Sequence, residues 1–493
     1  MFISGPALFR PEARGKIARM EPKTYDLVII GSGPAGEKGA TQAAYFGKTV
    51  ALIEKEPWLG GASANTGTLP SKTLRETALF LSGFRNRALY GLQFTLKQQV
   101  NVRDFMARER YICDTERARI QANLKRHRVR VYSGMASFVD PHTVAIKPTG
   151  SPEIEVRGEK ILIATGSSPY RPPIFPFHDP RVLDSDTILT LRDMPANLLV
   201  CGGGVIGCEY ACMFAALGVK VTLIEQRDRL VGFLDHEISA ALRRGMEGLG
   251  IQMCMSDAVV SVRNDDDIEL HLKSGAVVTG DAVLVSSGRN SNTSELGLEK
   301  VGVALGKRGL IPVNDHYQTA LPHIYAAGDV IGVPALASTS MEQARVAMVD
   351  AFDLKYKKSV AHHLPYGIYT IPECSMAGAT EEALIEGKVP YIAGRASYTA
   401  NARGQIIGDN DGFLKLLFRA GDMKLLGVHV IGEQATELVH VGLTALLLNA
   451  DADLFINSCY NYPTLSDLYK YATYDALGRR AASPIAAAEP SAA

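Results

Sequence analysis

Regularly spaced cysteines are missing from this 493-residue chain. No two of its cysteines have the two-residue spacing that zinc ribbons and dithiol redox motifs use, and its eleven histidines show no zinc-like spacing. An odd number of scattered thiols is typical of core cysteines in a reducing compartment, so we expect a cytoplasmic location and no metal site. The seven are Cys113, Cys201, Cys208, Cys212, Cys254, Cys374 and Cys459.

Net charge and long apolar runs are also absent. Lys and Arg number 52 and Asp and Glu number 52, which argues against nucleic acid or a membrane surface as a partner, although a local basic patch stays compatible. The richest apolar run, residues 197–224, is interrupted by Glu209, Tyr210 and five glycines. It predicts a strand, a turn, a helix and a strand, and we expect no segment that spans a membrane.

Glycine and apolar residues are abundant, with 46 glycines and 46% hydrophobic residues. This composition is typical of α/β proteins, and the length suggests about three domains. Residues 1–19 are basic but lack the apolar core of a secretory signal. Two interpretations of this segment remain: a loose extension before a true start at Met20, or a weak organellar presequence. The Ala- and Pro-rich residues 481–493 predict a disordered tail.

Two glycine-rich fingerprints organise the chain. Each follows a short apolar strand, opens a helix, and is followed by a second strand that ends in an acid 23 residues after the first glycine. Such βαβ units hold a pyrophosphate at the helix N-terminus and a ribose at the acid, so two dinucleotides are expected; a duplicated scaffold with one inactive site is the alternative. The first contains Gly31, Gly33, Pro34, Ala35, Gly36 and Glu54, and the second Gly202, Gly204, Val205, Ile206, Gly207 and Glu225.

Between the fingerprints, residues 60–72 read GGASANTGTLPSK. This segment resembles the GGxCxNxGCxPSK segment of the flavoprotein disulfide reductases, in which two cysteines pass electrons between flavin and a disulfide. Gly61 and the rest of the frame remain, but Ser63 and Thr68 replace the cysteines. A hydroxyl group forms neither a disulfide nor the thiolate that exchange requires.

Later motifs follow the order of the same family. Residues 161–166 resemble the crossover from the flavin domain to the nicotinamide domain, residues 283–289 the return crossover, and residues 324–329 the second flavin motif, whose aspartate binds the ribityl chain. From about residue 362 the chain resembles the family's interface domain. The resemblance covers residues 22–476 and places at the cofactors Ala164, Thr165, Gly166, Gly288, Arg289, Gly328, Asp329 and Ala337.

The resemblance implies an α/β fold with two Rossmann-like dinucleotide-binding domains, for FAD and NAD(P), and a C-terminal α+β dimerisation domain. FAD is the expected cofactor, NAD and NADP are the expected substrates, and a homodimer or a higher oligomer is the expected assembly. The expected divisions are a flexible extension (1–21), the first part of the FAD-binding domain (22–165), the NAD(P)-binding domain (166–289), the second part of the FAD-binding domain (290–360), the dimerisation domain (361–478) and a disordered tail (479–493).

The chain departs from the disulfide reductases at a third position. Their interface domain ends in HPTxxE, whose histidine is the thiol acid/base, whereas this chain has Tyr462 before Pro463 and Thr464. A tyrosine with an ordinary pKa is a poor proton shuttle at neutral pH. The joint loss of both cysteines and the histidine favours another electron acceptor.

Within the family, residues 461–464 and 67–72 are similar to those of the soluble pyridine nucleotide transhydrogenases. This implies ping-pong hydride exchange between NADPH and NAD through FAD in one nicotinamide pocket, with Ser63, Thr68 and Tyr462 beside the flavin. A NAD(P)H:quinone or dye reductase needs the same motifs and stays an alternative, as does a non-catalytic flavin-bearing redox sensor.

The resemblance also implies that Lys72 lies near the flavin N5 and pairs with Glu209, so that a fixed cation stabilises the anionic reduced ring. An ordinary solvated lysine is the alternative. A surface position for Glu209 is disfavoured, because its helix face is otherwise apolar and a buried carboxylate needs a partner.

Nucleotide choice depends on the end of the second fingerprint. Glu225 favours NAD because it can accept hydrogen bonds from the ribose 2′-hydroxyl, whereas Arg227 and Arg229 can pair with the 2′-phosphate of NADP. This combination predicts use of both nucleotides, or an NAD-specific enzyme whose arginines face solvent.

Overall fold

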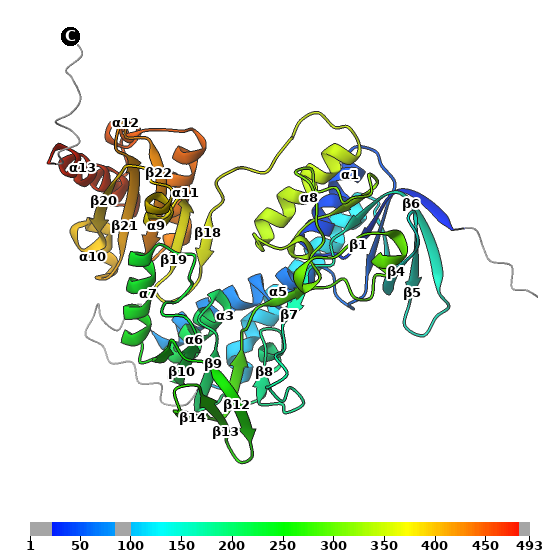
Figure 1. The fold of residues 1–493 in the computed structure, drawn as a ribbon, viewed down its shortest axis with the longest axis horizontal. Helices are drawn as coiled ribbons and strands as arrows, with labels where there is room; N and C mark the ends of the chain where they lie inside the picture. The colour runs from blue at the N-terminus through cyan, green and yellow to red at the C-terminus, as the bar shows by residue number, and fades with distance from the viewer. Residues whose placement is uncertain (1–21, 84–99, 483–493) are drawn as a thin grey trace, which may run out of the picture.

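The computed structural model describes residues 22–83 and 100–482 (Figure 1). The expectations for residues 1–21 and for the tail from residue 483 onward lie outside this part of the chain. Within it, every helix is too short or too polar to cross a membrane.

A seven-stranded sheet forms the first unit (Figure 1, right). The strand order is β3-β2-β1-β6-β5-β4, and β17 lies beside the C-terminal half of β6, with Ile324 opposite Ile161. The unit is therefore discontinuous, since its last strand follows the intervening second unit. Its strands are β1 (Lys23–Ile30), β2 (Val50–Glu54), β3 (Arg130–Ser133), β4 (Met135–Asp140), β5 (Thr143–Lys147), β6 (Ile154–Ile163) and β17 (Ile324–Ala326).

Both faces of this sheet are buried. Along β1, Leu27 and Ile29 pack on the side of helices α1 (Pro34–Tyr45) and α8 (Ala337–Ala351), whereas Val28 and Ile30 pack on the opposite side. The alternation follows from the two-residue period of a strand. A strand that is apolar on both sides is typical of a parallel sheet covered on both faces.

The second unit repeats this design around the parallel order β11-β10-β9-β15-β8, next to the antiparallel sheet β12-β13-β14. A two-stranded link, β7 (Ser167–Pro169) with β16 (Arg289–Ser291), joins the two units at the expected crossovers. The other elements are β8 (Val182–Leu183), β9 (Asn197–Cys201), α6 (Val205–Ala216), β10 (Lys220–Glu225), α7 (His236–Gly248), β11 (Gln252–Met255), β12 (Val259–Asn264), β13 (Ile268–Leu272), β14 (Val277–Gly280) and β15 (Ala282–Val285).

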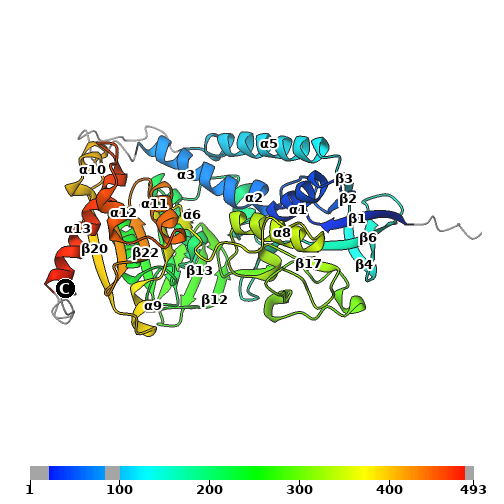
Figure 2. The same cartoon turned by 90° about the horizontal axis from the view of Figure 1, so that it is seen from above.

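Three helices lie between β2 and β3 in the chain: α2 (Gly61–Asn65), α3 (Thr68–Ser82) and α5 (Val102–Arg126). Figure 2 shows α3 and α5 along one side of the molecule. The long helix α5 begins after Asn101, which caps it by accepting a hydrogen bond from the backbone of Asp104. Because α3 packs on α6, residues near position 72 meet residues near position 209.

The C-terminal unit is an antiparallel sheet of order β18-β19-β22-β21-β20 with helices against it. Helix α13 ends at Ala481, and its buried apolar residues, up to Ala476, pack in the core of this unit. Its elements are β18 (Tyr366–Ile368), β19 (Cys374–Gly378), α9 (Glu381–Glu386), β20 (Tyr391–Ser397), α10 (Ala402–Ile407), β21 (Phe413–Arg419), β22 (Leu425–Ile431), α11 (Ala435–Leu447), α12 (Ala452–Asn457) and α13 (Leu468–Ala481). Short 3-10 turns are η1 (Thr187–Thr190), η2 (Leu298–Val301), η3 (Lys307–Gly309), η4 (Asp329–Ile331), η5 (Tyr398–Ala400) and η6 (Leu465–Asp467).

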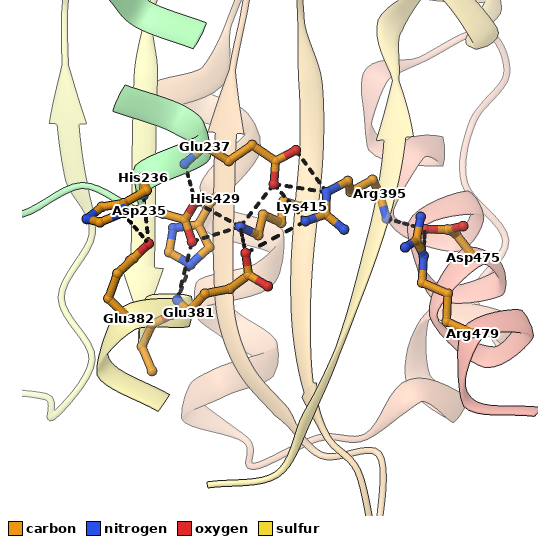
Figure 3. A network of polar contacts seen from close by, with 11 residues as sticks. Asp235, His236, Glu237, Glu381, Glu382, Arg395, Lys415, His429, Asp475 and Arg479 are labelled. Carbon is orange, nitrogen blue, oxygen red and sulfur yellow. Dashed lines mark hydrogen bonds and ion pairs between the residues drawn. The ribbon is translucent and has the colours of Figure 1, made fainter. Parts of the chain in front are cut away.

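A buried lysine joins the second unit to the C-terminal unit (Figure 3). Lys415 of β21 is 0% exposed, and its ammonium group donates to both carboxylate oxygens of Asp235, at 2.8 and 2.9 Å, and to Glu381. Glu237 lies 3.1 Å from the same ammonium group and also pairs with Arg395. Since Asp235 caps the N-terminus of α7, this network fixes α7 against the C-terminal sheet.

His429 lies beside this network and is fully buried. One ring nitrogen, Nε2, contacts the carbonyl oxygen of Ala379 at 2.9 Å, and burial lowers the pKa of His429, although Asp235 opposes that shift. The charged groups that act on it are Asp235, Lys415 and Glu382. The folded protein therefore keeps this imidazole neutral below the pH at which an unfolded chain protonates it.

This histidine predicts a pH dependence of stability. As pH falls below about 6.5, the unfolded state binds a proton that the native state does not, so the free energy of unfolding decreases by up to about 1.4 kcal/mol per pH unit until the folded pKa is reached. Urea unfolding between pH 7.5 and 5 should show a smaller decrease for His429→Gln, which keeps a hydrogen-bond donor but does not titrate. Parallel pH profiles for the two proteins would contradict this role.

Candidate functional site

A cleft of about 990 Å³ begins at the first glycine turn and extends between the first and second units to the start of the C-terminal unit. It brings together predicted residues from segments far apart in the chain. Those that line it are Gly31, Gly33, Pro34, Ala35, Glu54, Gly61, Ser63, Thr68, Lys72, Ala164, Thr165, Gly166, Val205, Ile206, Glu209, Arg289, Gly328, Asp329 and Ala337. Those that do not line it are Gly36, Gly202, Gly204, Gly207, Glu225, Arg227, Gly288 and Tyr462.

The third glycine of each fingerprint holds its helix close to the preceding turn. A Cβ on Gly36 would lie 1.9 Å from the carbonyl oxygen of Gly31, and a Cβ on Gly207 would lie 1.9 Å from that of Gly202. Neither position therefore admits a side chain. The close packing directs the first backbone N–H groups of α1 and α6 toward their glycine turns, where a phosphate can be bound.

The acid that ends β2 stabilises the first glycine turn. Glu54 Oε2 accepts hydrogen bonds from the backbone N and the Oγ of Ser32, at 2.9 and 2.6 Å, and Oε1 accepts one from the backbone of Glu56. Ser32 also accepts a hydrogen bond from the backbone of Gly60. Ser32 occupies a variable position of the fingerprint, so the motif did not indicate it, yet it links the turn to the segment that begins at Gly60.

Lys72 and Glu209 form the ion pair that the resemblance implies. The Nζ of Lys72 donates to Oε2 and Oε1 of Glu209 at 2.7 and 2.9 Å, and Oε1 also accepts from the backbone N of Tyr369 at 2.9 Å. The Glu209 side chain is 4% exposed and that of Lys72 is 26% exposed, so the ammonium group is open to the cleft. Lys72 also lies 4.9 Å from the ring centre of Tyr369, a cleft residue that sequence analysis did not identify.

Ser63 lies in α2 and Thr68 at the start of α3, both at the cleft wall. All seven cysteines fall within the described residues; all are free thiols and none lines the cleft. Burial raises the pKa of Cys201 and of Cys212 to about 12, which leaves these thiols protonated at neutral pH. Cys208 and Cys212 are core residues of α6, since both are 0% exposed.

The end of the second fingerprint contains an ion pair outside this cleft. Glu225 Oε2 accepts from the backbone N of Gly203 at 2.6 Å, and its Oε1 accepts from Nε of Arg227 at 3.0 Å. Burial alone would raise the pKa of Glu225, but the hydrogen bonds from Arg227 and Gly203 lower it below its ordinary value. The Arg227 side chain is 52% exposed, so a ligand can reach its guanidinium group.

Tyr462 makes no contribution to the cleft of its own chain. It is 77% exposed, in the segment between α12 and η6 of the C-terminal unit. The predicted place beside a flavin is therefore not reached within one chain, because Tyr462 is exposed and does not line the cleft.

Two orphaned hydroxyl groups indicate a polar ligand in the cleft. Thr165 Oγ1 and the Tyr210 phenol are buried and have no hydrogen-bond partner among the described residues, and both residues line the cleft. Buried hydroxyl groups normally have a partner, which a bound molecule would provide. A Cβ on Gly61 would lie 2.8 Å from Cα of Gly33, so the cleft floor keeps its shape only with glycine there. These features fit a dinucleotide such as FAD.

Comparisons with known proteins agree with this geometry. Residues 25–347 match the model of the pyridine nucleotide-disulphide oxidoreductases, and residues 364–473 match that family's dimerisation domain. The chain is 43% identical to a soluble pyridine nucleotide transhydrogenase of Mycobacterium tuberculosis over 93% of this chain and 98% of the relative. It is 39% identical to that of Chromohalobacter salexigens over 93% and 100%, respectively.

Solved structures show the same fold. LpdA from Mycobacterium tuberculosis superposes with a TM-score of 0.84 at 26% identity, covering 92% of this chain and 99% of that one. The HOCl-induced flavoprotein disulfide reductase RclA from Escherichia coli superposes with a TM-score of 0.81 at 27% identity, covering 90% and 99%. The expected arrangement of two Rossmann-like domains and a dimerisation domain is thereby confirmed.

Proposed function

This chain belongs to the pyridine nucleotide-disulphide oxidoreductase family, and from that membership we propose that it is an FAD-dependent transhydrogenase. It moves hydride between NADPH and NAD, in either direction, without a redox-active disulfide. One observation carries the proposal: the cleft keeps the Lys72–Glu209 pair while Ser63 and Thr68 occupy the positions of the two cysteines. Relatives at 39 to 43% identity bear the name of this activity.

The proposal assigns a role to each part of the cleft. Bound FAD would supply the redox chemistry, since a flavin accepts a hydride from one nicotinamide and returns it to another. The first glycine turn and Glu54 hold the dinucleotide, Asp329 and the 164–166 turn orient it, and Val205 and Ile206 border the nicotinamide side. Lys72 holds a positive charge at the cleft wall, and Glu209 fixes its position. No protein thiol or general acid is required, because hydride passes between bound organic groups.

The proposed function also assigns the chain to three domains. The FAD-binding domain comprises residues 22–165 and 290–360, the NAD(P)-binding domain residues 166–289, and the dimerisation domain residues 361–478. The dimerisation-domain match supports a homodimer, and the free thiols support a cytoplasmic location.

Use of both nucleotides depends on Glu225 and Arg227. With NAD, Glu225 accepts a hydrogen bond from the 2′-hydroxyl group. With NADP, the exposed guanidinium group of Arg227 pairs with the 2′-phosphate and reduces its repulsion by Glu225. Gly202, Gly204, Gly207 and Gly288 provide the backbone turns of this second nucleotide site.

Arg227→Gln is predicted to discriminate between the nucleotides. Loss of a charged hydrogen bond weakens binding by about 1.5 kcal/mol or more, so KM for NADPH should rise roughly tenfold while KM for NADH changes little. Steady-state kinetics with each nucleotide measures this, and the control is Arg243→Gln, a change at a half-buried residue of α7 that pairs with Glu247. Equal changes in KM for NADPH and NADH would show that Arg227 does not bind the 2′-phosphate.

Restored cysteines should not restore a disulfide reductase. The double variant Ser63→Cys, Thr68→Cys is expected to show no turnover of lipoamide or oxidised glutathione, because Tyr462 replaces the acid/base histidine. Robust turnover, with wild-type protein as the blank, would show that this tyrosine is no obstacle.

The proposed activity is tested by an anaerobic half-reaction. Purified protein is reduced with NADPH, freed of excess nucleotide and mixed with NAD while flavin absorbance is followed. Reoxidation at a rate that matches turnover is the expected result. If the flavin stays reduced until a quinone is added, the protein is a quinone reductase and not a transhydrogenase. A colourless protein that binds no FAD would contradict both functions.

A further inference from the structure

The end of the cleft beyond Glu54 is bordered by two stacked side chains that no sequence motif indicated. Trp58 follows β2 by a short loop and is 55% exposed, and Arg117 lies on α5. The guanidinium carbon of Arg117 is 4.8 Å from the ring centre of Trp58, and both residues line the cleft. An exposed indole ring at a cleft wall offers a planar apolar surface to a ligand.

Arg117 is held in a fixed orientation. Its Nε donates to Oδ1 of Asn65 at 2.7 Å, and its Nη1 donates to Oδ1 of Asp114 at 2.9 Å. Asn65 in turn donates to the carbonyl oxygens of Leu59 and Gly61, at 3.1 and 2.8 Å. Within the described residues, Nη2 of Arg117 has no hydrogen-bond partner. A guanidinium group fixed in this way, with a donor unused, is suited to a phosphate oxygen.

The neighbouring residues show which half of a dinucleotide lies here. The first glycine turn holds a pyrophosphate and Glu54 holds the ribose of an adenosine. Lys55 to Trp58 continue the cleft wall past Glu54, and residues 134–136 line the same end. The adenine must therefore lie at the end of the cleft that Trp58 borders.

We propose that Trp58 and Arg117 form a clamp on the adenosine diphosphate half of FAD. Trp58 covers the adenosine with its ring, and Arg117 presents Nη2 to the diphosphate while it stacks on the indole. The clamp rests on the assignment of FAD to this cleft under the proposed function. It retains and positions the cofactor at a distance from the reacting ring, so it contributes to cofactor affinity.

The test uses the full-length apoprotein and two probes, FAD and ADP. ADP carries the adenosine and the diphosphate but no flavin. Trp58 is the only tryptophan of the chain, so its emission reports directly on either ligand. In the wild type, both ligands should change this emission. Arg117→Met should raise the dissociation constants of FAD and ADP by the same factor, roughly tenfold.

For Trp58→Ala, binding of FAD is measured by flavin fluorescence and binding of ADP by competition with FAD. The dissociation constants of both ligands should rise by the same factor, as for Arg117→Met. Trp58→Phe, which keeps an aromatic plane, should stay within about threefold of the wild type. The matched controls are Phe80→Ala, an exposed aromatic residue of α3 outside the cleft, and Arg126→Met in the last turn of α5. Both should bind FAD and ADP as the wild type does.

The possible results distinguish a failure of the proposed clamp from a failure of the proposed function. If Arg117→Met and Trp58→Ala bind FAD and ADP as tightly as the wild type, the clamp is wrong and the proposed function stands. Weaker binding of FAD with unchanged binding of ADP also contradicts the clamp. The two residues would then not contact the adenosine diphosphate half, which FAD and ADP share. If the wild-type apoprotein binds no FAD, the cleft assignment and the proposed function fail together.

Discussion

Lys72→Ala should reduce the rate of flavin reduction by NADPH about 10²- to 10³-fold while the protein still binds FAD. The expectation rests on the ammonium group that faces the cleft and is held at 2.7 Å by Glu209. Removal of one preorganised group that stabilises developing charge typically has an effect of this size. Stopped-flow absorbance of the flavin under anaerobic conditions measures the rate directly.

Removing Lys72 alone also leaves the buried carboxylate of Glu209 without its partner, which can destabilise the fold. The double variant Lys72→Met, Glu209→Gln removes both charges and keeps an acceptor for the backbone of Tyr369. It should fold with near wild-type stability and still reduce its flavin slowly. A double variant with wild-type kinetics would show that the charge of Lys72 has no part in hydride transfer.

Lys415→Met should lower the free energy of unfolding by about 3 to 5 kcal/mol. Removing one partner of a buried ion pair leaves uncompensated charge in the interior, and the side chains of Lys415 and Asp235 are both 0% exposed. Glu381 and Glu237 would lose the same cation. Urea unfolding at pH 7.5 measures the change.

The control for this variant is Lys355→Met. Lys355 pairs with Asp353, but both side chains are about 80% exposed, and an exposed pair contributes little. Its free energy of unfolding should stay within about 0.5 kcal/mol of the wild type. Asp235→Asn added to Lys415→Met should recover part of the loss, because it removes the unpaired charge. A Lys415 variant as stable as the Lys355 variant would show that the network is dispensable.

The parts of the site that follow local spacing could be predicted from the sequence. Each glycine fingerprint sets a strand, a turn and a helix within 23 residues, so the positions of Gly31, Glu54 and their counterparts follow from short-range geometry. Glu209 was expected to need a partner because its helix is otherwise apolar, and α6 is buried in the structure. The family motifs then identified Lys72 as that partner.

Contacts between distant segments could not be predicted in this way. Arg117 and Trp58 lie on different elements, and neither belongs to a motif; only the packing of α5 beside the cleft brings them together. Lys415 is an isolated polar residue in an apolar strand, and its partners come from positions 235 and 381. Arg227 was expected to face either a phosphate or solvent, whereas it pairs with the neighbouring Glu225. Side-chain pairing of this kind depends on tertiary structure.

The late position of β17 has a consequence for synthesis of the chain. The first half of β6 pairs with β5, but Ile161 to Ile163 obtain their second neighbour only from β17. A ribosome reaches β17 roughly 160 residues after β6, a delay of roughly 10 to 30 s at cellular elongation rates. During that interval the nascent sheet carries a short open edge of isoleucine and leucine, a template for wrong pairing with other chains. The inserted second unit can fold during the same interval, so the nascent protein should need chaperone protection of its first sheet more than of its second.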